Sequence, residues 1–319
     1  LRLQALEKTN LTLLESVPQN FTSHVATIDS KVLAIFVSSN SLSLNLTRDS
    51  VGNLWMAANY SLNPGDYIST LTWVSSKTVS ENLTPLGFVQ FPEDYPEQVK
   101  TFLNPGRKMP VENKTIQEIA ANFKTNNMTQ TVRNILDFVS KQEYDREKTQ
   151  LLMSGNLNTT DILDSFEDAL EVLETNSSIC IERSWCAAAI LRAAGVPTRT
   201  VTDVRLKTWI QVWLDGYGWV DAEALCVQPP PMFPRPLSFV TPWMTENSSD
   251  AALPFTWLPK AGMRVANLTF GDVELFEVNQ YRTILSEPID KELFEKEPTK
   301  FSFPIVFKPE IVYAAITQE

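Results

Sequence analysis

Cysteine and histidine are the side chains best suited to act as nucleophile, base or metal ligand near neutral pH, and this chain holds few of either. It has three cysteines, Cys180, Cys186 and Cys226, and one histidine, His24. A single histidine excludes a metal site with several histidines and a pair of catalytic histidines. It also excludes a catalytic triad with a histidine other than His24. His24 stands in a polar segment with no acidic or cysteine neighbour at ligand spacing, so we expect no chemistry from it.

The composition excludes further classes of function. A net charge of -11 and the lack of any Lys or Arg run argue against nucleic acid and anionic membranes as partners. The ten glycines form no phosphate-binding loop, and no acidic cluster has EF-hand spacing, so we expect no cofactor and no metal. No apolar stretch reaches the roughly 18 residues of a membrane span.

Asparagine sequons are unusually frequent. Asn-X-Ser/Thr occurs eleven times, where chance would supply roughly three. Sequons become N-linked glycosylation sites only on a translocated chain, and the start at Leu1 instead of Met suggests a removed or omitted leader. We predict an extracellular, cell-surface glycoprotein, and the low charge resembles that of archaeal envelope proteins. The predicted sites are Asn10, Asn20, Asn45, Asn59, Asn82, Asn113, Asn127, Asn158, Asn176, Asn247 and Asn267.

The elements that must position the cysteines fall into three parts. Residues 30–90 alternate apolar and polar side chains between turn signals, which predicts an antiparallel sheet or small sandwich. Residues 91–98, with two prolines and three acids, are typical of a linker. We expect domains at 1–95, 101–235 and 236–319, the last ending in an edge strand because of its prolines.

The middle part changes to helical periodicity and then back to strands. Apolar residues at three- and four-residue steps predict helices over 115–123, 131–144 and 161–174, the third capped by Thr160 or Asp161. A fourth helix begins near Cys180, capped by Ser177 or Ser178, and ends at Gly195. Three strands follow, and the last two form a hairpin at Asp-Gly-Tyr-Gly.

This middle part resembles the transglutaminase-like superfamily, whose members are related to papain-type cysteine proteases. In that family a cysteine opens a helix twelve residues before the arginine of a Leu-Arg-Ala-Ala-Gly stretch. Here Cys180 stands twelve residues before Arg192 in LRAAGVPTR, and KTWIQVWLDGYGWVDAEAL follows. The resemblance covers about residues 101–226 and implies an α+β fold. The core of the implied fold has a helical lead-in and a cysteine helix packed on an antiparallel sheet. We expect a β-rich N-terminal domain before this core and a β-containing C-terminal region after it.

The resemblance also assigns positions for a catalytic triad of Cys, His and Asp. Aligning Trp209, Val212 and Trp213 with the family's His-Ala-Trp-Val-Glu-Val pattern places Lys207 at the histidine position. Counting four residues past Trp219 places Glu223 at the aspartate position. The triad-equivalent residues are therefore Cys180, Lys207 and Glu223.

This set is a poor catalyst for acyl transfer. A glutamate beside Lys207 would raise the lysine pKa, so an ion pair is expected instead of a neutral base. Ser178 replaces a glycine common in the family, and a glycan on Asn176 would crowd Cys180. Trp209, Trp213 and Trp219 at strand spacing indicate core packing.

The fold implied by the resemblance also suggests a disulfide. It brings the start of the cysteine helix near the end of the Glu223 strand, so Cys226 would lie closer to Cys180 than to Cys186, about 9 Å further along the helix. We predict a bond between Cys180 and Cys226, with Cys186 as a buried thiol. The alternatives are a bond between Cys186 and Cys226, or three free thiols.

Three functions remain open. The first is a cell-surface glycoprotein in which an inactive transglutaminase-like domain has a structural or binding role. The second is a cysteine-dependent acyl transferase or hydrolase that uses Cys180, Lys207 and Glu223. The third is a subunit of a surface layer or filament. The predicted partners are N-linked glycans, other cell-surface proteins and copies of the chain itself.

Overall fold

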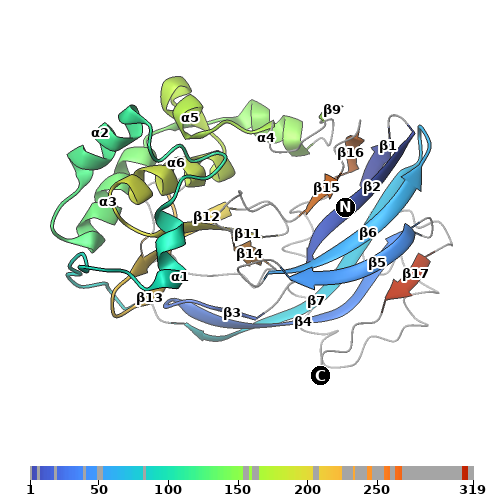
Figure 1. Ribbon diagram of the computed structural model, residues 1–319, viewed down its shortest axis with the longest axis horizontal. Coiled ribbons are helices and arrows are strands. Elements are labelled where there is room, and N and C mark those ends of the chain that lie inside the picture. Colours follow the sequence, from blue (N-terminus) through green and yellow to red (C-terminus); the bar gives the residue numbers. More distant parts are fainter. Residues whose placement is uncertain are drawn as a thin grey trace.

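The fold is described here from a computed structural model. The described residues are 2–5, 8–17, 20–38, 41–48, 53–81, 84–153, 158–159, 165–203, 208–224, 233, 243–245, 255–258, 263–267 and 311–314. Helices and strands are both present, which confirms the predicted α+β class. The helices gather at one end of the molecule and the long curved strands at the other, with a smaller sheet between them (Figure 1).

Two antiparallel sheets contain the N-terminal strands. A seven-stranded sheet has the order β17-β4-β7-β1-β16-β9, with β3 paired to β4, and a four-stranded sheet has the order β15-β2-β6-β5. Along β6 buried residues alternate with less buried ones, as the sequence pattern predicts for a sheet with one buried face. The N-terminal strands are β1 (Arg2–Ala5), β2 (Thr9–Val17), β3 (Phe21–Thr22), β4 (Ala26–Ser38), β5 (Ser41–Arg48), β6 (Leu54–Leu62) and β7 (Tyr67–Glu81).

Strands from beyond residue 250 extend both of these sheets. β15 (Phe255–Leu258) pairs with β2, β16 (Met263–Asn267) pairs with β1, and β17 (Ile311–Ala314) pairs with β4. Among the described strands, β17 lies at the edge of its sheet, as expected for the proline-rich C-terminal segment. The C-terminal region thus contributes strands to sheets that begin in the first part of the chain, while the domain boundaries stay a prediction.

The helical part follows the expected linker and agrees with three of the four predicted helices, which correspond to α2, α3 and α6. Within the described residues of the predicted helix over 161–174, the helix begins only at Ala169. α2 and α3 are each capped by an asparagine side chain, Asn113 and Asn127, which accepts a hydrogen bond from a first-turn amide. The helices are α1 (Glu97–Lys100), the 3-10 turn η1 (Thr101–Leu103), α2 (Lys114–Phe123), α3 (Met128–Val139), α4 (Arg146–Met153), α5 (Ala169–Thr175) and α6 (Cys180–Ala193). Short strands β8 (Glu143–Tyr144), β9 (Asn158–Thr159) and β10 (Ser177–Ser178) lie between them.

The predicted caps of the last two helices are wrong. α5 begins at Ala169, because the Asp168 carboxylate accepts from the amides of Leu170 and Glu171 while Glu171 accepts from the Asp168 amide. Thr160 and Asp161 lie outside the described residues.

At the start of α6 the capping residue is Ile179. Its amide donates to the Glu182 carboxylate at 3.0 Å. Ser177 and Ser178 form β10 instead, beside β8. The cap of this helix is therefore provided by a carboxylate inside the first turn and not by the preceding serines.

α6 is the centre of the core and packs on the middle sheet. From Ile181 to Arg192 every residue is buried, so the helix has no solvent-facing side over this span. The middle sheet has the order β13-β12-β11-β14, and the β12–β13 hairpin is as predicted. Its strands are β11 (Thr198–Asp203), β12 (Thr208–Leu214), β13 (Gly218–Ala222) and β14 (Trp243–Thr245).

Candidate functional site

Cys180 is the first residue of α6 and is partly exposed. The Ser184 hydroxyl, one turn further on, lies 2.8 Å from the Cys180 carbonyl oxygen and 3.1 Å from the carbonyl oxygen of Thr208. Thr208 is the first residue of β12. The start of the cysteine helix therefore lies beside the start of β12, as the resemblance implies.

Glu223 lies at the matching end of the neighbouring strand. It directly follows β13, is 3% exposed, and comes one residue after Ala222, which pairs with Ile210 of β12. Lys207 precedes Thr208 and lies outside the described residues. Of the three triad-equivalent residues, Cys180 and Glu223 are thus described. Cys180 begins α6 and Glu223 directly follows β13, and both of these element ends lie toward the start of β12.

The only histidine lies at the other end of the hairpin. The His24 amide donates to the Trp219 carbonyl oxygen at 2.7 Å, and its ring meets the Tyr217 ring edge-on with centroids 5.0 Å apart. Trp219 is four residues before Glu223, which corresponds to roughly 13 Å along an extended strand. His24 therefore packs against the turn of the hairpin, and the end at which Glu223 lies has no histidine.

Ser178, two residues before Cys180, lies in the core. Its side chain is buried, and its hydroxyl donates to the Gln142 side-chain oxygen at 3.2 Å and accepts from Arg183 Nε at 3.0 Å. Arg183 also donates to the carbonyl oxygens of Gln142 and Glu143. Serine at this position is a core hydrogen-bonding residue that joins β10 to the segment before β8.

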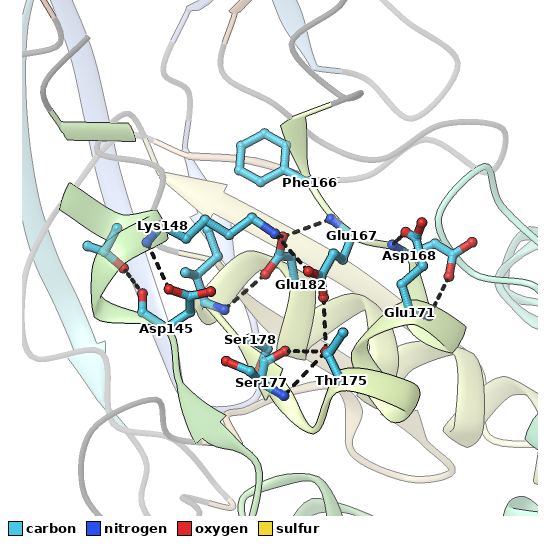
Figure 2. A network of polar contacts seen from close by, with 12 residues as sticks. Asp145, Lys148, Phe166, Glu167, Asp168, Glu171, Thr175, Ser177, Ser178 and Glu182 are labelled. Atoms are coloured by element: carbon cyan, nitrogen blue, oxygen red, sulfur yellow. Dashed lines mark hydrogen bonds and ion pairs between the residues drawn. The ribbon is translucent and has the colours of Figure 1, made fainter. Parts of the chain in front are cut away.

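A buried ion pair fixes the first turn of α6 (Figure 2). The Glu182 carboxylate is completely buried, contacts the Lys148 ammonium of α4, and accepts from the Glu167 amide at 2.8 Å. Lys148 also lies 3.4 Å from the Glu167 carboxylate. Burial alone would lower the pKa of Lys148, but its hydrogen bond and charge interactions with Glu182 and Glu167 raise the pKa above the ordinary value.

The arginine of the family-like motif has a structural role. Arg192 is 2% exposed, and its guanidinium donates to the carbonyl oxygens of Thr198 and Asn104 at 2.8 Å each. These contacts join α6 to the first residue of β11 and to the loop after η1. The spacing from Cys180 to Arg192 therefore reflects the length of the helix that carries both residues.

A polar row crosses the middle sheet, and the sequence analysis did not identify it. Arg199, Gln211 and Asp221 stand opposite one another on three successive strands. Arg199 Nε donates to the Gln211 side-chain oxygen at 2.9 Å, and Gln211 donates to the Asp221 carboxylate at 3.1 Å. Trp209 Nε1 donates to the same carboxylate oxygen at 2.8 Å. The period of two was visible in the sequence, but the strand register needed to align these residues was not.

The tryptophans have the packing roles that were predicted. Trp213 and Trp219 form a cross-strand pair, with Tyr95 edge-on to Trp213 and Phe102 edge-on to Trp219. The Arg199 guanidinium lies 4.1 Å from the Trp219 ring centroid. These rings thus attach the segment around α1 to the sheet.

The cysteines differ in environment. Cys186 carries a free, completely buried thiol, as predicted, and the Gln142 amide lies 3.7 Å from its sulfur. Burial raises the pKa of this thiol from 9.0 to about 12. Cys226 lies outside the described residues, so its pairing with Cys180 stays a prediction.

Where the side chain of a predicted glycosylation site is described, it is never buried. Asn10, Asn20, Asn45 and Asn176 are exposed, and Asn59, Asn113 and Asn127 are partly exposed. Asn158 and Asn267 lie in β9 and β16, while Asn82 and Asn247 lie outside the described residues. Asn176 ends α5 in the left-handed conformation with φ of 54°, four residues before Cys180.

Neither a metal-binding group nor a membrane-spanning helix occurs among the described residues. None of their His, Cys, Asp and Glu side chains form a group able to hold a metal ion. Their helices also include none with the length and apolar character needed to cross a membrane.

Residues 117–224 match the model of the transglutaminase-like superfamily. The middle of this chain is a transglutaminase-like domain. The match spans the segment from α2 to the end of the β12–β13 hairpin, and so includes Cys180 and Glu223. A search of curated proteins finds no match.

Two solved structures were compared with the chain. A "putative cysteine protease" from Cytophaga hutchinsonii is 15% identical over 82% of this chain and 83% of its own, with a TM-score of 0.54. At this identity the likeness shows a shared fold. A "putative protease" from Parabacteroides distasonis is 14% identical over 72% of this chain and 43% of its own, with a TM-score of 0.28, and supports no further statement.

Proposed function

We propose that this chain is an extracellular, N-glycosylated cell-surface protein whose transglutaminase-like domain is catalytically inactive and has a structural or binding role. The observation that carries the proposal is the position of His24 at the turn of the β12–β13 hairpin, away from Glu223. A thiol nucleophile of this family needs an imidazole to accept its proton and return it to the leaving group. The sole imidazole of the chain is too far along the sheet for that role.

The residues that replace histidine and aspartate cannot restore the chemistry. Protonated Lys207 would stabilise a thiolate on Cys180 by its charge, but it holds its proton near neutral pH and so cannot shuttle one. Glu223 would strengthen this effect, since a carboxylate near the ammonium raises the lysine pKa. We therefore infer an ion pair between Lys207 and Glu223 in place of a catalytic pair.

The exposure of the sequon asparagines supports glycosylation. A bulky hydrated sugar cannot enter a core, and the sequon asparagines whose side chains are described are all at least partly exposed. Helix capping is compatible with modification, because Asn113 and Asn127 accept hydrogen bonds through Oδ1 while a glycan is attached to Nδ2. A sugar on Asn176 would project close to Cys180 and restrict access of a large acyl substrate.

Two measurements on native material test the proposal. Intact-mass spectrometry should give a mass above that of the bare polypeptide, with sugars mapped to several sequons. Turnover of glutamine-donor and peptide substrates should equal that of Cys180→Ala, and Lys207→His should remain inactive. A native mass equal to that of the polypeptide would remove the glycoprotein proposal. Wild-type activity that is lost in Cys180→Ala would contradict the proposal that the domain is inactive.

One observation favours the alternative of a cysteine-dependent acyl transferase or hydrolase. Ser178 is turned into the core by Gln142 and Arg183, so the replacement of glycine does not close the approach to Cys180. A partly exposed thiol at a helix N-terminus is also where a reactive cysteine is found. Under this alternative Lys207 and Glu223 support a thiolate, and selective labelling of Cys180 with iodoacetamide at pH 7 would favour it.

The third candidate is a subunit of a surface layer or filament. Strands from the end of the chain already pair with N-terminal strands, so a related exchange between copies would use the same edges. Light scattering on native material distinguishes this candidate, because it requires particles much larger than one chain.

A further inference from the structure

Three of the predicted glycosylation sites lie in one row across the β15-β2-β6-β5 sheet. Asn10 of β2 is opposite Ser61 of β6, and Asn59 of β6 is opposite Ser43 of β5. Asn59 stands two residues from Ser61, the partner of Asn10. Asn45 stands two residues from Ser43, the partner of Asn59. Residues two apart on a strand share a face, and such diagonal neighbours are about 7 to 8 Å apart.

The row lies on the outer face of the sheet. Along β6 the residues that alternate with Asn59, among them Met56 and Ala58, are completely buried, whereas Asn59 is only partly buried. Asn10 and Asn45 are exposed. The core lies under one face of β6, and the three asparagines lie on the other.

Within the described part of the chain, β5 is an edge of this sheet. Its partner there is β6, and its outer side has no paired strand among the described residues. Leu46, next to Asn45, is 41% exposed. An edge strand with an exposed leucine is a template for a further strand, which would lie about 4.8 Å beyond it.

We propose, on the basis of the glycosylation inferred above, that glycans on Asn10, Asn59 and Asn45 form a stripe across this outer face. The glycan on Asn45 keeps the β5 edge from pairing with a strand of a second copy. Side chains stand perpendicular to a sheet, so a branched sugar on Asn45 extends over the edge where an incoming strand and its side chains would lie.

The experiment uses the full chain produced in a host that attaches N-linked glycans. Asn45→Gln and Thr47→Ala remove the same sequon by different changes. We expect glycopeptide mapping to find sugar on Asn45 in the wild type, and light scattering to show about a twofold or larger increase in particle mass for both variants. Adding Leu46→Lys to Asn45→Gln should restore the monomer, because a charged side chain on an edge strand opposes pairing.

Asn59→Gln is the matched control, since it removes a neighbouring glycan from the same face but from an inner strand. It should remain monomeric. If Asn45 is glycosylated and both variants stay monomeric, the edge proposal is wrong and the proposed function stands. A native mass equal to that of the bare polypeptide would contradict both the edge proposal and the proposed glycoprotein function. Self-association that Leu46→Lys leaves unchanged, with a lowered melting temperature, indicates unfolding and contradicts edge protection.

Discussion

Glu182 shows how the first turn of α6 is fixed by charge. Its carboxylate is completely buried, yet both oxygens have partners: one accepts from the Ile179 amide, and the other accepts from the Glu167 amide and contacts Lys148. A buried carboxylate is tolerated only with such compensation. Cys180 stands two positions before it, so this pair holds the helical turn that carries the candidate nucleophile.

Lys148→Met should therefore destabilise the protein. It leaves the Glu182 charge buried without its cation, at a cost of roughly 2 to 4 kcal/mol, the low side of the usual range because Lys148 keeps some contact with water. Urea unfolding monitored by tryptophan fluorescence measures the loss. Lys114→Met is the control, because the Lys114–Glu118 pair is exposed and should contribute less than about 0.5 kcal/mol. Equal losses would refute the role of Glu182.

The buried thiol of Cys186 predicts a dependence of stability on alkaline pH. Its pKa is about 12 in the folded protein against an ordinary 9.0, so below pH 9 both folded and unfolded states keep the proton. Between about pH 9 and pH 12 the unfolded chain loses the proton first, and the free energy of unfolding falls. Cys186→Ala should show a shallower decline over that range. Parallel slopes for the two proteins would contradict the prediction.

At the level of elements, helix ends and strand register decide which residues meet. The periodicity of the sequence predicts α2 and α3, because each has an apolar face set by local spacing, while α6 and the β12–β13 hairpin were predicted from the residues at the helix ends and in the turn. The caps of α5 and α6 were missed, because in both helices a glutamate inside the first turn, Glu171 or Glu182, accepts from the amide of the residue before the helix. The spacing of residues in the sequence does not show that a glutamate side chain will accept from the amide before its own helix.

The triad-equivalent positions could be predicted only through the family-like motif. Nothing in the composition connects Cys180 with Glu223, which lies more than forty residues later. The link between the two positions comes from the packing of α6 on β12 and from the register that sets Ala222, the residue before Glu223, opposite Ile210. The Arg199, Gln211 and Asp221 row was missed for the same reason, since register is a property of paired strands.

Asp168→Ala should weaken α5. The carboxylate accepts from two first-turn amides at 2.8 and 3.0 Å, and the loss of such a cap costs about 1 kcal/mol. The expected signature is a lower free energy of unfolding together with faster amide exchange at Leu170 and Glu171. Asp137→Ala, at an exposed position inside α3, provides the comparison and should change neither quantity. Unchanged exchange in Asp168→Ala would show that tertiary packing holds the helix end.

At the scale of the whole molecule, strands from both ends of the sequence make up the large sheets. β2 pairs with β15, and β4 pairs with β17, although more than two hundred residues separate the members of each pair. The transglutaminase-like domain lies between them in sequence. Folding must therefore bring distant segments together, which is slow and leaves strand edges open in the meantime. Any covalent link that shortens the effective chain would stabilise such a topology.

The predicted disulfide between Cys180 and Cys226 is such a link. It would close a loop of about 45 residues, for which the chain-entropy model gives about 4 kcal/mol of stabilisation, less any strain. Since typical folding stabilities are 5 to 15 kcal/mol, reduction should lower the melting temperature by several degrees. The same bond would occupy the candidate nucleophile, so native protein should take up iodoacetamide at Cys180 only after reductant is added. Peptide mapping with and without reductant measures this directly, with the buried Cys186 as the internal reference that stays protected in both samples. Labelling of both Cys180 and Cys226 in the absence of reductant would disprove the bond and return Cys180 to the acyl-transfer alternative.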